Sequence, residues 1–249
     1  MKSVYEIKKE ICEVGHIMYE LGFVAANDGN ISVKVGENEF YCTPTGVSKR
    51  DLTPDMIIKV DKNGKKLEGR LNPSSEIKMH MRVYQERPDV NAVVHAHPPV
   101  ATAFTIAGID LDQYILPEAV LTIGSVPTCE YGTPSTMEIP DSLLPYIQNH
   151  DAFLLQNHGA LTVGCNLNKA RFVMEEVEFN AKICKYAMEL GAVHEIPNDQ
   201  LKKLMDLRKK MNIPGRHPGI EIEEPACNCG ANEDLVAEIT RRVLAALGR

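Results

Sequence analysis

The apolar positions of the first sixty residues follow two different periods. Five apolar residues recur every three or four positions: Ile7, Ile11, Val14, Met18 and Leu21. This spacing places them on one face of a helix, which we expect to end at Gly22. From residue 31 the period changes to two, which predicts a strand over 31–35, with 39–42 as its hairpin partner. A further short strand is expected over 56–60.

The middle and second half of the chain mix both patterns. A helix is expected from Ser74 or Ser75 to about Gln85, and β-branched residues over 91–97 predict a strand. Two more strands are expected at 152–155 and 160–163, joined by a turn. Asn168 is suited to cap a long helix that ends at Leu190, and a further helix is expected over 199–211. Because these elements do not alternate as strict β-α-β units, the pattern indicates an α/β chain and disfavours a parallel doubly wound sheet.

The composition changes after Pro218, which divides the chain into three parts. Residues 1–218 form the expected catalytic domain. Residues 219–231 contain several Glu, a Pro and two Cys with few large apolar residues, which indicates a linker. From residue 232 the apolar spacing predicts an amphipathic helix over 232–249. A short helix on a tether is marginal alone in water, so its apolar stripe needs a surface to pack on.

Charge and hydropathy exclude several classes of protein. The chain has 27 Lys and Arg and 34 Asp and Glu, which gives a net charge of −7. We expect no nucleic-acid partner, because binding of nucleic acid needs clustered basic residues. No apolar run reaches the ~18 residues of a membrane helix. Charges throughout residues 1–20 are unlike a secretory signal. We therefore expect a cytoplasmic protein.

Three histidines carry the strongest chemical signal. His95 and His97 lie two positions apart on the expected strand, so both imidazoles project from the same face and can share one metal ion. A single histidine on an apolar strand is more often only a buried, hydrogen-bonded residue. His158, in the turn between two apolar strands, is a natural third ligand. Three histidines with an open fourth position are typical of catalytic zinc.

Asn72-Pro73-Ser74-Ser75-Glu76 allows two interpretations. A serine cap followed by Glu in the first turn is favoured at any helix start, and this explains the residue types without a function. Alternatively, the hydroxyls of Ser74 and Ser75 at a helix N-terminus bind an anion, and Glu76 is a proton-transfer group held beside the metal.

Two further turns could supply donors to a phosphate. Gly29-Asn30-Ile31-Ser32 and Thr43-Pro44-Thr45-Gly46 both combine side-chain donors with glycines that let backbone N–H groups approach a ligand. Neither is a P-loop, and neither is specific alone. The spacing does not establish that these turns converge.

The chain resembles the class II aldolase/adducin family over about residues 3–215, most closely its L-fuculose-1-phosphate aldolase branch. The resemblance is carried by five motifs in order along the chain, namely the three turns above, His95-Ala96-His97 and Gln156-Asn157-His158-Gly159. The resemblance implies a three-layer α/β/α fold around a largely antiparallel central sheet, a homotetramer with active sites at subunit interfaces, and a zinc ion. It implies that His95, His97 and His158 bind zinc, and that Glu76 is the catalytic acid/base and also touches the resting metal. It assigns phosphate binding to Asn30, Thr45, Gly46, Ser74 and Ser75.

The implied reaction is reversible cleavage of a ketose 1-phosphate to dihydroxyacetone phosphate and a short aldehyde such as lactaldehyde. A pentulose-phosphate 4-epimerase, which carries Asp at the position of Glu76, and a ketose 1-phosphate dehydratase are alternatives within the family. A non-catalytic adducin-like interaction module lacks the metal histidines. The chain departs from the aldolase pattern at Leu116, where the family has Tyr, with Tyr114 as a substitute. It also has no Tyr around 210–212.

The expected C-terminal helix over 232–249 resembles the encapsulation peptides that load enzymes into bacterial microcompartments. This likeness implies shell proteins as partners and a location inside a microcompartment. The alternative is an ordinary helix packed on its own subunit or tetramer.

Overall fold

A computed structural model describes residues 2–219 of the chain. The predicted helix over 232–249, and all of the predicted linker except residue 219, lie outside the described residues. Within 2–219, no helix has the length and apolar content needed to span a bilayer.

One eight-stranded sheet organises the fold, in the order β4-β3-β2-β1-β5-β8-β7-β6. All neighbouring strands are antiparallel except β6 and β7. The strands are β1 (Asn30–Gly36), β2 (Glu39–Cys42), β3 (Ile58–Asp61), β4 (Lys66–Glu68), β5 (Ala92–Ala96), β6 (Thr128–Cys129), β7 (Ala152–Leu155) and β8 (Gly159–Gly164). The expected largely antiparallel sheet is confirmed.

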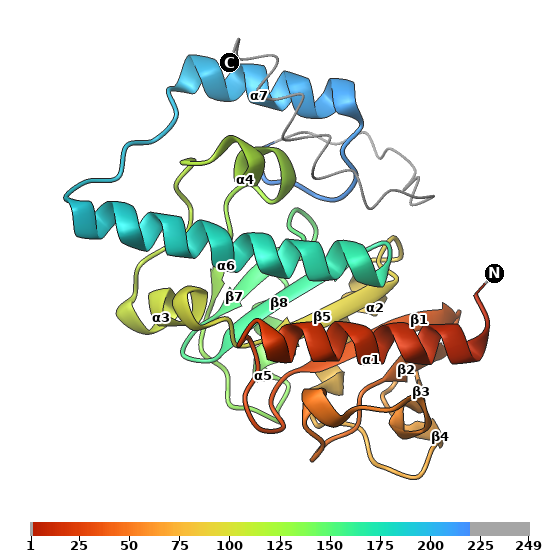
Figure 1. The fold of residues 1–249 in the computed structure, drawn as a ribbon. Coiled ribbons are helices and arrows are strands. Elements are labelled where there is room, and N and C mark those ends of the chain that lie inside the picture. The colour runs from red at the N-terminus through yellow and green to blue at the C-terminus, as the bar shows by residue number, and fades with distance from the viewer. Residues whose placement is uncertain (1, 220–249) are drawn as a thin grey trace.

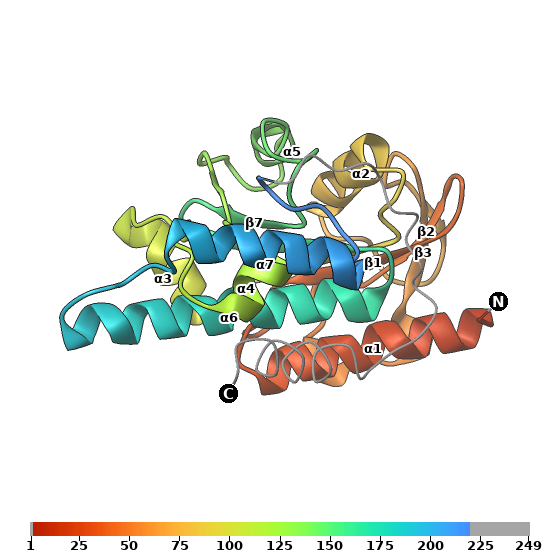
Figure 2. The ribbon, with the colours of Figure 1, turned by 90° about the horizontal axis from the view of Figure 1, so that it is seen from above.

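Helices cover both faces of the sheet, which gives the expected three layers (Figures 1 and 2). Helices α1, α3 and α6 pack on one face, and α2 and α5 on the other, each over its own apolar cluster. Beyond α6, α4 and α7 form an outer pair with a small core of their own. The helices are α1 (Val4–Glu20), α2 (Ile77–Glu86), α3 (Pro99–Ala107), α4 (Pro117–Thr122), α5 (Glu138–Ser142), α6 (Leu167–Leu190) and α7 (Asn198–Met211).

Two predicted helix starts were wrong. Asn166, not Asn168, caps α6, because its side chain accepts a hydrogen bond from the Lys169 N–H. Helix α2 begins at Ile77 rather than at Ser74 or Ser75. The antiparallel bridge between Pro44 and Pro73 keeps the chain extended up to residue 73, so the two serines fall in the turn that follows.

Candidate active site

The centre of the sheet fixes the first histidine. His95 lies within β5, paired with Asn30 of β1 on one side and with Leu161 of β8 on the other. Its side chain is buried, and its Nδ1 donates to the Ala160 carbonyl oxygen at 2.9 Å. A carbonyl only accepts, so the proton sits on Nδ1 and the Nε2 lone pair is free for a metal.

The second histidine follows the last ladder residue of β5. The His97 N–H donates to the Phe23 carbonyl oxygen at 2.8 Å, and its Nδ1 lies 3.6 Å from Asp28 Oδ2. Gly159 of the neighbouring strand faces it closely. A Cβ added there would lie 2.5 Å from the Ala96 oxygen and 2.6 Å from His97 Cδ2, so this close approach requires glycine.

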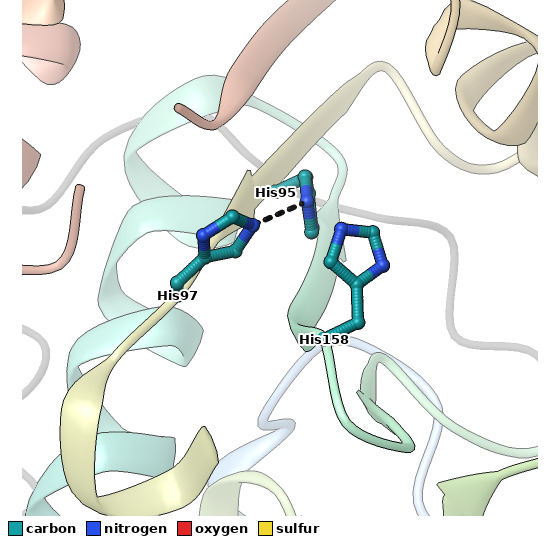
Figure 3. A group of neighbouring side chains, drawn as sticks. All are labelled: His95, His97 and His158. Atoms are coloured by element: carbon teal, nitrogen blue, oxygen red, sulfur yellow. Dashed lines mark hydrogen bonds between the residues drawn. The ribbon is translucent and has the colours of Figure 1, made fainter. Parts of the chain in front are cut away.

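The turn between β7 and β8 brings the third ring to the other two. Figure 3 shows His95, His97 and His158 turned toward one another, each with a nitrogen facing the space between them. Their ring centroids are 4.8 to 5.1 Å apart, and one ligand atom from each lies within 4.8 Å of the others. The 3.2 Å between His95 Nε2 and His97 Nε2 fits two nitrogens bonded tetrahedrally at about 2.0–2.1 Å, which are roughly 3.3 Å apart.

Burial keeps two of these imidazoles neutral. It is the largest cause lowering the pKa of both His95 and His97, and the neighbouring His158 ring lowers the pKa of each further. A neutral imidazole is the form that binds a metal ion, so no proton has to be displaced from these two ligands near neutral pH. The donor set therefore fits a divalent cation such as zinc.

Glu76 lies beside the histidines, at the start of α2. Its Oε1 is 3.1 Å from His158 Nε2 and its Oε2 is 3.7 Å from His95 Nε2. Asn30 Nδ2 donates to Oε2 at 2.6 Å. Burial alone would raise the pKa of the Glu76 carboxyl, but the two histidines and the Asn30 hydrogen bond outweigh it and lower the pKa. The carboxylate is thus ionised and able to accept a proton.

The turns whose convergence the spacing left open do meet in space. The Thr45 N–H donates to the Asn72 oxygen at 2.9 Å, which places Thr45 and Gly46 beside the segment leading to Ser74. Gly46 adopts a left-handed φ of 74°, so its backbone turns without steric cost. Ser74 Oγ accepts from the Glu76 N–H at 3.2 Å.

The turn that contains Thr45 and Gly46 also contacts the start of β1. The Ile31 N–H donates to Thr43 Oγ1 at 3.1 Å, and the Thr43 N–H donates to the Ile31 oxygen at 3.0 Å. Asn30, next to Ile31, therefore stands near the Thr45-Gly46 turn. Ser75 is exposed, and its hydroxyl hydrogen-bonds to Ser135 at 2.7 Å. Four of the five expected phosphate positions are thus linked by short contacts, whereas the Ser75 side chain is engaged with a different loop.

Sequence reasoning missed a buried lysine beneath these turns. Lys49 Nζ donates to the Asn27 oxygen at 3.2 Å and to the Val47 oxygen at 3.3 Å, joining the turn before Asn30 to the one after Gly46. Burial lowers its pKa to about 8. From the sequence, a lysine next to a turn is expected to be exposed on the surface. Only the fold shows that Lys49 is buried and joins the two turns.

Tyr114, expected as the substitute for a family tyrosine, is half-buried and packs against the apolar cluster of α4 and α7. Leu116 caps α4 without a side-chain hydrogen bond. Both lie just before α4, and Leu116 packs against the main apolar cluster on the α1, α3 and α6 face of the sheet.

Comparison with known proteins gives consistent matches. Residues 9–184 match the family described as Class II Aldolase and Adducin N-terminal domain. The L-fuculose phosphate aldolase of Escherichia coli (strain K12) is 35% identical over 192 residues, covering 77% of this chain and 87% of that protein. The 3-oxo-tetronate 4-phosphate decarboxylase of Pectobacterium atrosepticum is 30% identical over 187 residues, covering 74% and 85%.

Solved structures share the fold. An L-fuculose 1-phosphate aldolase structure superposes with a TM-score of 0.75 at 30% identity, covering 82% of this chain and 96% of the other. The YgbL structure from Klebsiella pneumoniae superposes with a TM-score of 0.76 at 26% identity, covering 82% and 100%.

Proposed function

The chain belongs to the class II aldolase and adducin family, and on that premise we propose that it is a zinc-dependent aldolase. Its substrate would be a ketose 1-phosphate resembling L-fuculose 1-phosphate, cleaved reversibly to dihydroxyacetone phosphate and a short aldehyde such as lactaldehyde. The observation that carries the proposal is the meeting of three imidazoles with one ionised carboxylate, beside turns rich in neutral donors.

His95, His97 and His158 would hold the metal, which when bound supplies a Lewis acid for the substrate's carbonyl and hydroxyl oxygens. Glu76, which also touches the resting metal in this proposal, takes the proton from the carbon next to the carbonyl in the condensation direction. In the cleavage direction it returns that proton to the same carbon. Asn30, hydrogen-bonded to Glu76, orients the carboxylate for this transfer.

The phosphate would sit among neutral donors rather than lysines. In this proposal the Thr45 hydroxyl, the Gly46 N–H and the hydroxyls of Ser74 and Ser75 donate to the phosphate, with Asn30 at the edge of the site. The Ser75 hydroxyl would exchange its hydrogen bond to Ser135 for one to the phosphate. Such a cradle binds the phosphate oxygens mainly through hydrogen-bond donors, with the Lys49 ammonium beneath the turns.

The test is a substrate panel. Purified zinc-loaded protein is incubated with fuculose, rhamnulose, ribulose and 5-deoxyribulose 1-phosphates, and dihydroxyacetone phosphate release is measured. Release from at least one, lost on chelation and restored by zinc, supports the aldolase. No release from any, together with no stoichiometric zinc and no gain on adding it, would instead support a non-catalytic, adducin-like interaction module.

A second candidate is a decarboxylase, favoured by the Pectobacterium atrosepticum relative. Loss of CO2 next to a ketone leaves an electron pair on the same kind of carbon, so the same metal and the same Glu76 can serve. Release of CO2 from 3-oxo-tetronate 4-phosphate, with no dihydroxyacetone phosphate from the panel, would favour it. An epimerase or a dehydratase would convert its sugar phosphate without releasing either product.

We also propose a homotetramer with active sites at subunit interfaces. The His97 side chain is 28% exposed and that of Glu76 18% in the single chain, which leaves room for a neighbouring subunit to complete the site. Light scattering coupled to gel filtration tests the assembly, and a monomer at assay concentration would contradict it.

For residues 232–249 we propose binding to microcompartment shell proteins, with the enzyme otherwise cytoplasmic. Deleting residues 220–249 should spare activity and abolish co-localisation with shells in cells that make them. If the truncated enzyme still associates with shells, the tail is not the targeting element.

A further inference from the structure

Helix α3 lies between two of the histidine turns. It starts at Pro99, two residues after His97, and its last turn contacts the segment that carries His158. His95 is held by the hydrogen-bond ladders on both sides of β5, whereas His97 and His158 lie one and two residues beyond the last pair of the β5–β8 ladder, Ala96 with Ala160. Contacts beyond the ladder therefore contribute to the separation of these two rings.

The N-terminus of α3 is fixed by a single carboxylate from another helix. Pro98 and Pro99 have no N–H, and the cap residue Pro98 provides no side-chain acceptor. The first available donors are the Val100 and Ala101 N–H groups, and both donate to Glu178 of α6, at 3.1 and 2.9 Å to Oε2. Glu178 is only 1% exposed. Its charge also suits the positive end of the helix dipole.

The contacts around Glu178 lead back to His97. Lys182, one turn along α6, lies with its Nζ 3.4 Å from Glu178 Oε1 and 5.9 Å from the centre of the Phe23 ring. The Phe23 carbonyl oxygen accepts the His97 N–H. Phe23, which accepts the His97 N–H, and the N-terminus of α3 are therefore both in contact with the same part of α6.

The far end of α3 is attached to the His158 turn. Thr105 Oγ1 donates to the Thr102 oxygen at 2.8 Å and accepts from the Asn157 N–H at 3.1 Å. Asn157 has a φ of 56°, an uncommon conformation for a residue other than glycine. A hydrogen bond that holds this residue also orients the next one, His158.

We propose that α3 sets the separation of His97 and His158, and that Glu178 and Thr105 are positioning residues that fix its two ends. The inference rests on the proposed function only in requiring that the three histidines bind a metal ion. Neither residue touches the histidine rings, so both act through the backbone that carries them.

The experiment measures metal binding by the full-length protein, with Co2+ as a spectroscopic probe and Zn2+ by chelator competition. The variants are Thr105→Val, which keeps the shape but loses the acceptor, Thr105→Ser, which restores it, and Glu178→Ala. Thr105→Val and Glu178→Ala should bind Co2+ roughly 10–100-fold more weakly, the range typical of groups that orient metal ligands. Their visible Co2+ spectra should shift, and Thr105→Ser should behave like the unsubstituted protein.

Matched controls separate positioning from general loss of stability. Thr122→Val removes a similar helix hydroxyl, which donates to the Glu118 oxygen at 2.8 Å in α4. Asp151→Asn alters another buried carboxylate, which accepts the Arg216 N–H at 3.0 Å. Both should lower the melting temperature without changing the Co2+ spectrum or affinity.

Wild-type affinity and spectrum in Thr105→Val would overturn the proposal, even if Glu178→Ala fails to fold. An equal loss of Co2+ affinity in Thr122→Val and Asp151→Asn would overturn the proposal as well. Destabilisation alone would then be sufficient to explain the weaker metal binding. If the unsubstituted protein binds neither Co2+ nor Zn2+, the proposed metal site is wrong. That result differs from the two outcomes above, which test only the positioning role of α3.

Discussion

Replacing Glu76 by Gln isolates proton transfer from metal binding. The amide has the same shape as the carboxylate, and its oxygen can still accept from Asn30 Nδ2, which lies 2.6 Å from Glu76 Oε2. The hydrogen bond changes from charged to neutral, which costs about 1 kcal/mol of stability. The protein should therefore fold and keep its three imidazole ligands.

Catalysis should change much more than stability. A positioned general acid/base contributes about 10²–10⁴-fold, so Glu76→Gln should lower kcat by this factor, about 3–5 kcal/mol in the barrier. The assay is dihydroxyacetone phosphate release from the best substrate of the panel. Exchange of a carbon-bound proton of dihydroxyacetone phosphate in heavy water should fall by a similar factor, because it needs the same base and no aldehyde.

The control is Glu86→Gln in the same helix, where the side chain pairs with Arg82 at 3.5 Å on the surface. It should retain full activity, since exposed pairs contribute about 0–1 kcal/mol. If Glu76→Gln holds a full complement of zinc and still exchanges the proton at near the original rate, Glu76 is not the acid/base.

Three further substitutions test the site and the fold. His95→Ala should lose stoichiometric zinc, measured by elemental analysis, because this ring presents its free Nε2 from a fixed strand; unchanged zinc content would remove His95 from the ligand set. Burial lowers the pKa of His80 to about 4, below the unfolded value of about 6.5, so the unfolded chain binds more protons between these values. Stability of the metal-free protein should thus fall by up to about 3 kcal/mol as pH drops from 6.5 to 4, and urea unfolding of His80→Gln should show a weaker dependence. Arg87→Met leaves Asp151 buried without its 2.8 Å partner and should cost about 3–5 kcal/mol in urea unfolding, whereas Arg70→Met, on the surface, should cost under about 1 kcal/mol.

Local periodicity predicted the elements that have one polar and one apolar side. The stripe from Ile7 to Leu21 became α1, and the alternation over 31–35 became β1. Helix α3 was missed because Pro99–Ala107 is apolar nearly throughout, so no face stands out. The strand order, with β1 between β2 and β5, depends on contacts between distant segments and has no local signal.

The histidines were predictable because their chemistry is tied to local spacing. A period of two placed His95 and His97 on one side, and the ring distances show that His158 lies beside them. The supporting residues were not predictable in this way. Glu178 sits in a helix rich in charged residues, where an acid is usually solvated, and its burial becomes visible only when α3 is placed against α6.

The metal ligands and Glu76 cannot by themselves separate the aldolase from the decarboxylase, since both reactions leave an electron pair next to a carbonyl. They differ in the leaving group. Aldol cleavage must take a proton from a hydroxyl, whereas a carboxylate leaves as CO2 without a proton to remove. In this chain Tyr114 is the tyrosine nearest to Leu116, where the family resemblance places such a group. Tyr114→Phe should therefore lower aldol cleavage by about 10²-fold, the lower end of the range for a lost acid/base, and leave decarboxylation unchanged. Equal losses in both activities would mean that the Tyr114 hydroxyl supports the structure around α4 and α7 rather than moving the substrate proton.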